Sequence, residues 1–286
     1  MKVVVIGAAG QLGQDLLREF GDGAVGLTHQ EVDVTDGVGV LSALQRVKPE
    51  WVLNAAAFHR VDDCEANPSL ALDVNALGAL NVARAAEACD AGVVFFSSDY
   101  AFGGGGHTRG RPHLESDTPA PLNVYGASKV AGEHLVMQNA RRHLVVRSAG
   151  LYGTATSRKG WTFPELMLQK GRADGAVSVV DDQVLSPTYT ADLAAAVKEL
   201  LEAGASGLVH LTNGGECSWF DLARETFKLA GLDVRMQKLS TAQTARRARR
   251  PGYSALASAR LSSFGIAALR PWQEALEAYL IAKGVL

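Results

Sequence analysis

The first thirteen residues constrain the fold most, because a β-branched apolar run is followed at once by closely spaced glycines. Residues Lys2–Ile6 read KVVVI, and a run this uniformly apolar predicts a central parallel strand that is covered on both faces. Gly7, Gly10 and Gly13 follow in the arrangement G-x-x-G-x-x-G, and apolar residues recur at helical spacing from Leu12. The sequence therefore predicts a strand, a tight turn and a helix.

A glycine turn between a buried strand and a helix is suited to binding a pyrophosphate. Its first two glycines let the backbone turn and approach the phosphates, and the third allows close packing of the helix against the sheet. The helix N-terminus supplies N–H donors and positive potential. We therefore expect a dinucleotide to bind at Gly7, Gly10, Gln11, Leu12 and Gly13.

Strands and helices continue to alternate through the first half of the chain. Strand-like segments lie at 24–27, 51–54, 93–97 and 144–147, separated by amphipathic segments at 37–47, 70–88 and 124–138. Alternation of this kind produces right-handed crossovers. The sequence therefore predicts an α/β fold with a Rossmann-type doubly wound parallel sheet.

The second half is organised more loosely. Its predicted elements are a strand at 177–180, helices at 190–202 and 218–230, a strand at 208–211 and a closing helix from Pro271. We predict an NAD(P)-binding Rossmann domain over residues 1–150 and a smaller, interleaved α/β substrate-binding lobe over residues 151–286. A segment near 183–200, with Ser186-Pro187, is expected to return to the first domain.

The glycine run Gly103–Gly106 and the polar tract through Arg111 form the predicted mobile loop. Four glycines together lower the cost of disorder, because glycine has the greatest backbone freedom. Loops of this kind lie at the protein surface.

Composition and charge exclude several classes of protein. The 28 Lys and Arg against 30 Asp and Glu give a net charge of −2, so nothing favours nucleic-acid binding and an anionic ligand needs a local site. The three cysteines are too few and too scattered for a disulfide framework. No stretch approaches the roughly 20 apolar residues that cross a bilayer. We expect a cytoplasmic monomer or homodimer with no membrane partner.

Tyr125 and Lys129 form a Y-x-x-x-K motif at the start of a predicted helix. Four residues apart, they project from one face. A cation beside a phenol lowers the phenol pKa, which suits Tyr125 to act as a general acid toward a carbonyl oxygen. The motif follows a strand that ends in Ser98, Asp99 and Tyr100. We expect these three residues to contact the substrate, because ligands of open α/β sheets bind at strand ends.

The end of the second strand bears on the choice of cofactor. An acid there would hydrogen-bond the adenosine ribose and repel a 2′-phosphate, and residues 28–30 include none. This absence favours NADPH, with Thr28 or His29 near the phosphate, while NADH stays open. Asp33, followed by Val34, is interpreted either as an adenine contact or as the cap of the next helix.

Together these motifs resemble the extended short-chain dehydrogenase/reductases and, among them, the dTDP-4-dehydrorhamnose reductase family. The most specific motifs are P-L-N-V-Y-G and A-R-R-P. Matching stretches run the length of the chain, at 54–57, 61–65, 98–100, 121–126, 182–188, 248–251 and 270–272. The resemblance implies NAD(P)H-dependent reduction of the 4-keto group of a nucleotide sugar, which gives dTDP-L-rhamnose.

The resemblance also implies roles for individual residues. It makes Tyr125 the proton donor, Lys129 its partner and the ligand of the nicotinamide ribose, and Ser98 the hydroxyl bonded to the substrate carbonyl. The residues expected to line the cofactor with backbone groups are Asn54, Ala55 and Ala56. Asn75 is interpreted either as an organiser of a nearby helix or water, or as a structural amide.

The densest basic run places four arginines among residues 246–250. Guanidinium groups offer bidentate donors to phosphate, so we expect Arg249 and Arg250 to bind the substrate diphosphate, with a solvated charged loop as the alternative. The spacing of His59 with residues 62–64 matches no zinc motif. We therefore predict no metal site, and a dependence on Mg²⁺ stays open.

Two departures from the family pattern leave the identity of the substrate sugar open. Gly150 stands where many members have Trp, and Phe58-His59-Arg60 replaces small or hydroxyl residues. Two alternative functions stay open: an epimerase or reductase acting on another sugar, and a non-catalytic NADP-binding subunit resembling the β-subunit of methionine adenosyltransferase. A dehydratase is disfavoured, because Asp99 is followed by Tyr100 rather than by Glu.

Overall fold

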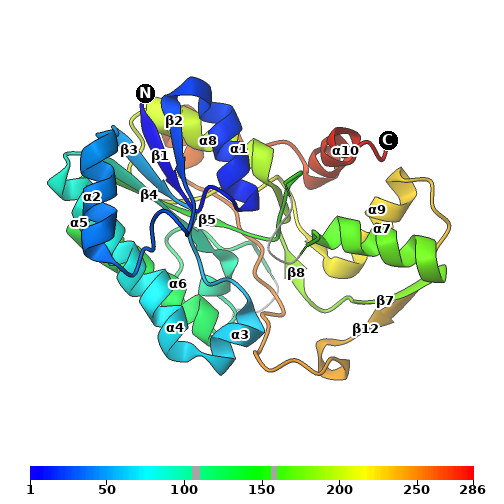
Figure 1. The fold of residues 1–286 in the computed structure, drawn as a ribbon. Helices are drawn as coiled ribbons and strands as arrows, with labels where there is room; N and C mark the ends of the chain where they lie inside the picture. Colours follow the sequence, from blue (N-terminus) through cyan, green and yellow to red (C-terminus); the bar gives the residue numbers. More distant parts are fainter. Residues whose placement is uncertain (105–109, 156–159) are drawn as a thin grey trace.

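A six-stranded parallel sheet forms the centre of the computed structural model (Figure 1), which describes residues 1–104, 110–155 and 160–286. The strand order is β10-β5-β4-β3-β1-β2. The strands are β1 (Val3–Ile6), β2 (Ala24–Leu27), β3 (Trp51–Asn54), β4 (Gly92–Ser98), β5 (His143–Ser148) and β10 (Gly207–His210). All five pairings are parallel. The predicted α/β fold with a doubly wound parallel sheet is therefore confirmed.

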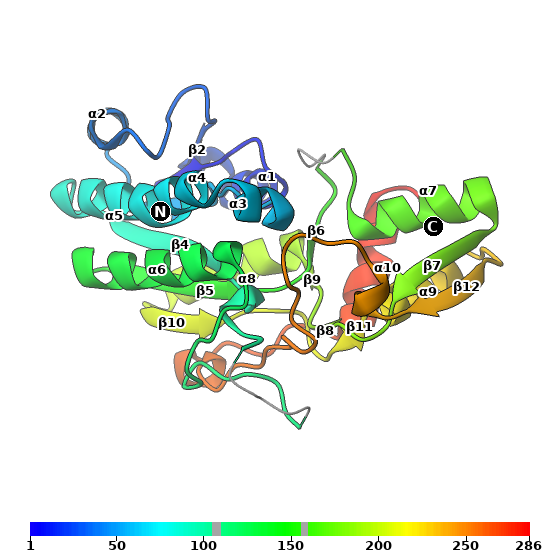
Figure 2. The same cartoon turned by 90° about the horizontal axis from the view of Figure 1, so that it is seen from below.

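Helices cover both faces of this sheet because its central strands are apolar on both sides. Val3 and Val5 of β1 pack into a core with helices α1 (Gln11–Phe20) and α8 (Thr190–Glu202). Val4 and Ile6 point to the other face, which α2 (Gly37–Val47), α5 (Gly78–Ala88) and α6 (Val124–Asn139) cover. Figure 2 shows the sheet from the face that α5 and α6 cover. The predicted helix over 70–88 is interrupted, as α4 (Pro68–Leu72) leads through a π-helical turn, η2 (Asp73–Leu77), into α5.

The smaller lobe has a core of its own, rich in aromatic side chains. The rings of Tyr152 and Tyr279 meet edge to face at 5.1 Å, and Tyr189 stacks on Tyr152. The helices of this lobe are α7 (Phe163–Asp174), α9 (Trp219–Leu229) and α10 (Trp272–Ala282). Its paired strands are β7 (Ala176–Val180) with β12 (Arg235–Leu239), β8 (Val184–Leu185) with β11 (Cys217–Ser218), and β6 (Leu151–Tyr152) with β9 (Thr188–Tyr189).

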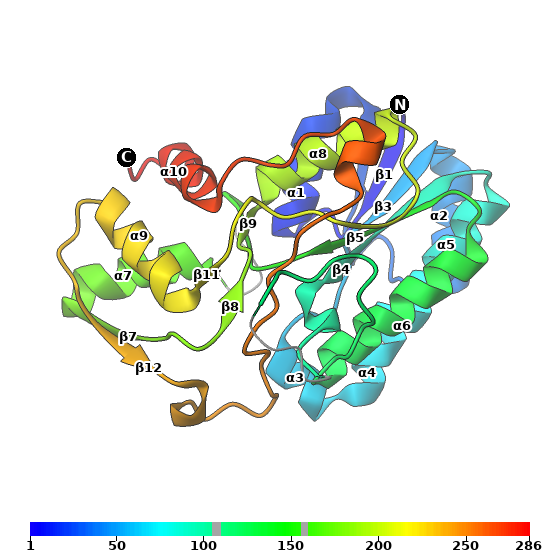
Figure 3. The same cartoon turned by 180° about the vertical axis from the view of Figure 1, so that it is seen from behind.

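The second half of the chain passes repeatedly between the lobes. Helix α8 packs on α1, and β10 extends the central sheet beside β5. The segment between β12 and α10 then runs back along the first lobe (Figure 3), where Leu256 pairs with His113. The division at residue 150 stays a prediction. Residues 105–109 of the predicted mobile loop lie outside the described residues.

The place of α8 in the first lobe's core can be tested at Leu193, which is fully buried with Leu12 and Leu16 of α1. Leu193→Ala should lower the free energy of unfolding by about 2–5 kcal/mol, because it removes buried methyl groups and leaves a cavity. Urea denaturation measures the change. Ile281→Ala, in α10 and 58% exposed, is the control, with an expected change within about 0.5 kcal/mol. Equal losses in the two variants would contradict the packing.

Candidate active site

The strand order reverses beside β1, which has β2 on one side and β3 on the other. In open α/β sheets the carboxyl ends of strands at such a point form a ligand crevice. Gly7 ends β1 with φ +83°, and a Cβ there would lie 2.8 Å from the amide nitrogen of Ala56 and 2.9 Å from the carbonyl carbon of Ala55. The glycine turn therefore lies directly against the end of β3, where Asn54 Oδ1 accepts from the Ala56 N–H.

The N-terminus of α1 has the features of an anion site. Gly10 is the N-cap and supplies no side-chain acceptor, so the first amides of α1 lack the partner that a capping side chain gives. Gln11 Nε2 is buried without a hydrogen-bond partner among the described residues. At Gly13 a Cβ would lie 2.9 Å from the Ala8 Cα, so only glycine lets the helix pack this closely. These residues fit a dinucleotide pyrophosphate.

The Glu31 side chain folds back onto the end of β2. The sequence analysis did not predict this contact. The Glu31 carboxylate accepts from the Thr28 amide and from the Thr28 hydroxyl, both at 2.8 Å. The amide hydrogen bond is the largest cause that lowers the Glu31 pKa. A negative charge therefore lies at Thr28, beside the exposed His29.

The Asp33 side chain accepts from the Thr35 amide at 2.9 Å, while Asp36 caps α2 by accepting from its first amides. The capping role considered for Asp33 therefore belongs to Asp36. Val34 is buried in the core beneath α2 and α5. An adenine contact at Asp33 and Val34 stays a proposal.

The end of β4 presents Ser98 and turns Asp99 inward. Ser98 Oγ donates to Asp99 Oδ1 at 3.0 Å and accepts from the Tyr100 amide at 3.1 Å. The second carboxylate oxygen of Asp99 accepts from Ser254 Oγ at 2.5 Å. Burial raises the pKa of Asp99 to about 6. Asp99 is 3% exposed, so its position supports orienting Ser98 rather than the substrate contact we expected.

Helix α6 brings the phenol of Tyr125 to the Ser98 hydroxyl. Asn123 caps α6 by accepting from the Gly126 amide at 2.8 Å, and the Ser98 side chain lies close enough to Tyr125 to act on the pKa of its phenol. The Tyr125 and Tyr100 rings meet edge to face at 5.7 Å. The structure therefore assembles the predicted set of Ser98, Tyr125 and Lys129 from β4 and α6. We did not single out Asn123, although Asn before a helical run signals an N-cap.

Burial dominates the ionisation of the two motif residues. Burial raises the pKa of Tyr125 well above its ordinary value. Burial also lowers the pKa of Lys129 to about 7, against the opposing effect of Glu133, and the ammonium lies 4.1 Å from the centroid of the Phe95 ring. The predicted lowering of the Tyr125 pKa is therefore wrong. The pKa is raised, because desolvation outweighs charge attraction.

The basic run is anchored on helix α3 (Val61–Ala66). Asp62 accepts from Arg250 Nη2 at 2.8 Å and from the Ala248 amide at 2.9 Å, and Arg246 lies 3.9 Å away. Arg250 Nη1 is buried without a hydrogen-bond partner among the described residues. Arg249 is exposed, and its carbonyl accepts from Asn123 Nδ2 at 2.8 Å. The Arg249 backbone therefore lies at the N-cap of α6, two residues before Tyr125, whereas the Arg250 side chain is held against α3.

Asn75 joins the segment after β3 to α6, and both interpretations of its role stay predictions. Its Oδ1 accepts from the Phe58 amide at 2.8 Å, and its Nδ2 donates to the Phe58 carbonyl at 2.9 Å and to Ser128 Oγ at 3.0 Å. Asn75 thereby fixes the segment after β3 against α6, beside the motif that carries Tyr125 and Lys129.

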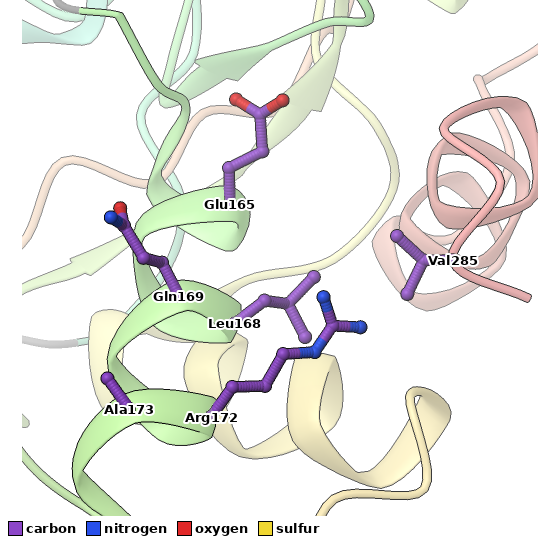
Figure 4. A pocket seen from close by; sticks show the side chains of 6 residues that line it. All are labelled: Glu165, Leu168, Gln169, Arg172, Ala173 and Val285. Atoms are coloured by element: carbon purple, nitrogen blue, oxygen red, sulfur yellow. The ribbon is translucent and has the colours of Figure 1, made fainter.

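Within the described ranges, no three His, Cys, Asp or Glu side chains are grouped as a metal site requires. A shallow pocket lies between α7 and the C-terminal Val285 (Figure 4), and it is lined by Glu165, Leu168, Gln169, Arg172 and Ala173. These elements carry none of the predicted site residues. None of the described helices has the length and apolarity needed to cross a membrane.

A glycine turn at the switch point of a doubly wound sheet, with Ser98, Tyr125 and Lys129 at the adjoining strand ends, defines an NAD(P)-dependent oxidoreductase of the extended short-chain dehydrogenase/reductase class. The family model described as RmlD substrate binding domain matches residues 1–284. The chain belongs to this family.

Relatives and solved structures agree with this assignment. The chain is 37% identical over 281 residues to dTDP-4-dehydrorhamnose reductase of Mycolicibacterium smegmatis, covering 96% of this chain and 84% of the relative. It is 38% identical over 278 residues to dTDP-4-keto-6-deoxy-D-glucose reductase of Streptomyces niveus, covering 96% and 94%. The crystal structure of dTDP-4-dehydrorhamnose reductase from Bacillus anthracis in complex with NADP superposes with a TM-score of 0.92 at 35% identity, covering 99% and 100%.

The buried Lys129 should make stability depend on pH. Its pKa is lowered from 10.5 to about 7, so between these values the unfolded chain binds more protons and rising pH stabilises the fold. Lys129→Met removes this term. The variant should be more stable than wild type at pH 7, and its advantage should shrink by on the order of 1 kcal/mol per pH unit toward pH 10.

Chemical denaturation at pH 7, 8, 9 and 10 measures the difference. Lys228→Met is the matched control, because the Lys228 side chain is 72% exposed and its removal should change stability by a nearly constant amount. A constant difference for Lys129→Met as well would contradict the lowered pKa.

Proposed function

We propose that this chain catalyses the NADPH-dependent reduction of the 4-keto group of a dTDP-4-keto-6-deoxy sugar, the reaction of a dTDP-4-dehydrorhamnose reductase, with dTDP-L-rhamnose as product. The observation that carries this proposal is the cluster formed by Ser98 at the end of β4 with Tyr125 and Lys129 of α6, in which the Tyr125 ring meets the Tyr100 ring edge to face. It lies at the strand ends beside a glycine turn suited to a dinucleotide. The names of the relatives support the nucleotide sugar.

The cofactor is proposed to bind along the crevice from β2 to β4. The turn at Gly7, Gly10, Gln11, Leu12 and Gly13 would hold the pyrophosphate, with Asn54, Ala55 and Ala56 beside it. Asp33 and Val34 are proposed at the adenine, and Thr28 and His29 at the 2′-phosphate. The NADP in the Bacillus anthracis structure supports NADPH, whereas the Glu31 carboxylate at Thr28 works against a 2′-phosphate.

When bound, the reduced nicotinamide supplies a hydride to the carbonyl carbon. Tyr125 donates its phenolic proton to the carbonyl oxygen, and Ser98 orients that oxygen by hydrogen bonding. The raised pKa of Tyr125 keeps the phenol protonated at neutral pH, which is the form a general acid needs. The Lys129 ammonium then stabilises the phenolate, and it would hold the nicotinamide ribose.

The substrate diphosphate is proposed to lie over the start of α6. Arg249 is exposed there, and Arg250 keeps one guanidinium nitrogen free of hydrogen bonds to described residues while Asp62 holds the other. Tyr100 lines the same side, against Tyr125. Asp99 acts on Ser98 from within the protein instead of on the sugar.

A second sugar stays an alternative substrate, because the Streptomyces niveus relative is named for a keto sugar of the D-glucose series. The complete set of Ser98, Tyr125 and Lys129 favours catalysis over a regulatory NADP-binding subunit. The cytoplasmic location, the monomer or homodimer and the absence of a nucleic-acid partner stay predictions, and a dependence on Mg²⁺ stays open.

The proposal is tested by mixing the protein with dTDP-6-deoxy-L-lyxo-4-hexulose and following the loss of NADPH absorbance. NADH is compared under the same conditions, and the product sugar is identified by NMR. Absence of turnover with either cofactor, while NADPH still binds, would favour the regulatory alternative.

Replacing the proton donor should separate chemistry from binding. Tyr125→Phe should lower kcat by on the order of 10²-fold or more, the usual scale for general acid catalysis, while the Kd for NADPH stays within about twofold. Tyr152→Phe is the matched control, because this buried hydroxyl in the smaller lobe has no hydrogen-bond partner among the described residues. A near-normal kcat in Tyr125→Phe would remove Tyr125 from the mechanism.

The arginine contacts should appear in KM. Arg249→Ala or Arg250→Ala should each raise KM for the nucleotide sugar by roughly 10- to 150-fold and leave kcat nearly unchanged, because a charge-assisted bond to phosphate acts equally in ground and transition states. Arg247→Ala, exposed in the same segment, should change KM by less than about twofold. If the Arg249 and Arg250 variants weaken NADPH binding instead, the segment contacts the cofactor.

A further inference from the structure

A buried ion pair lies behind the Ser98, Tyr125 and Lys129 set, between α6 and the central sheet. Glu133 and Arg147 are 1% and 2% exposed. The Arg147 Nε donates to Glu133 Oε1 at 2.8 Å, and its Nη2 donates to Glu133 Oε2 at 2.5 Å. Ser97 Oγ also donates to Oε1, at 2.5 Å. Both carboxylate oxygens are therefore satisfied without solvent.

The network joins the strands of the sheet to the helix that carries the reactive groups. Ser97 precedes Ser98 on β4, Arg147 lies on β5, and Glu133 follows Lys129 by one turn of α6. Arg147 also reaches His210 of β10, with 3.4 Å between Nη1 and Nε2. A buried ion pair adds little stability over a well-packed apolar pair, because desolvation offsets its attraction. The position of this ion pair, one helical turn from Lys129, suggests that it affects the reactive groups.

The Glu133 carboxylate acts on the charge of Lys129. The ammonium is 1% exposed and rests on the face of Phe95. Burial lowers the pKa of Lys129 to about 7, and the Glu133 carboxylate acts in the opposite direction. Without that carboxylate, desolvation would leave Lys129 largely neutral at neutral pH.

Other ionisable groups surround this part of α6. Those beside Tyr125 and Lys129 are Cys64 of α3, Asp99 and Tyr100 of η3 (Asp99–Ala101), Arg147 of β5, and Glu133 and Tyr125 on α6 itself. Asp73 of η2 and Arg84 of α5 are exposed, and Arg84 contacts Asn139 at the far end of α6. Among these groups Glu133 combines full burial, a one-turn spacing and a negative charge fixed by three hydrogen bonds.

We propose that Glu133 is a positioning residue for the reaction: its fixed carboxylate, one turn of α6 away from Lys129, favours the cationic form of Lys129, and its bond to Ser97 holds α6 in register with the strand end that carries Ser98. The catalytic part of this inference rests on the proposed reductase function. The effect on the Lys129 charge belongs to the protein itself, so it can be measured without substrate.

The test follows the Lys129 titration by NMR in protein labelled with [ε-¹³C]lysine, with the resonance assigned by its loss in Lys129→Met. Glu133→Gln should move the titration midpoint down by about one pH unit or more. The alkaline loss of kcat should shift down with it. Ser97→Ala is the matched control, because it removes a hydrogen bond but keeps the charge, and its midpoint should stay within about 0.3 pH units of wild type. Glu133→Asp keeps the charge, so its midpoint should lie closer to that of wild type than to that of Glu133→Gln.

If Glu133→Gln leaves Arg147 unpaired and does not fold, the double variant Glu133→Gln/Arg147→Met replaces both buried charges together. Its Lys129 midpoint is compared with that of Arg147→Met, so that only the Glu133 charge differs, and should be the lower of the two. A midpoint equal to that of the reference, wild type for the single variant or Arg147→Met for the double, overturns the inference whatever the activity. A lowered midpoint in a protein that never turns over the keto sugar would support the charge role and refute the proposed function instead.

Discussion

The reversal of strand order beside β1 is the constraint on which the rest of this structure depends. Because β1 is buried on both faces, helices must cover both sides of the sheet, and the crossovers leave in opposite directions from β1. A crevice therefore opens where β1 and β3 end. Gly7 lies so close to Ala55 and Ala56 that a Cβ would collide with their backbone. The glycine turn and the end of β3 are thus two walls of one site.

Burial has the largest effect on the pKa values of Asp99, Tyr125 and Lys129 at this site. The phenol of Tyr125 stays protonated, Lys129 titrates near pH 7 and Asp99 near pH 6. Charges that must persist in such surroundings need fixed partners, as Glu133 has in Arg147 and Ser97. The same low dielectric that raises the cost of these charges strengthens the interactions they make.

Three contacts attach the late segment of the chain to the site in the first lobe. Ser254 bonds to Asp99, the Arg249 carbonyl to Asn123, and Arg250 to Asp62. Each contact joins residues more than 120 positions apart, so the substrate side of the site forms only when both halves of the chain are folded. A change in the segment at 248–254 can therefore alter the position of Ser98 and the start of α6 without touching either element's sequence.

The sequence by itself determined the strand and helix order and the doubly wound sheet, because hydrophobic periodicity and glycine spacing are local properties. The set of Ser98, Tyr125 and Lys129 came from the Y-x-x-x-K spacing together with the family resemblance. Tertiary structure alone decided that Glu31 folds back onto Thr28, that Asp99 faces Ser254, and that Glu133 pairs with Arg147. It also reversed the expected pKa shift of Tyr125. Desolvation and long-range ion pairs depend on which residues the fold brings together, and neither quantity is encoded in the spacing of neighbouring residues.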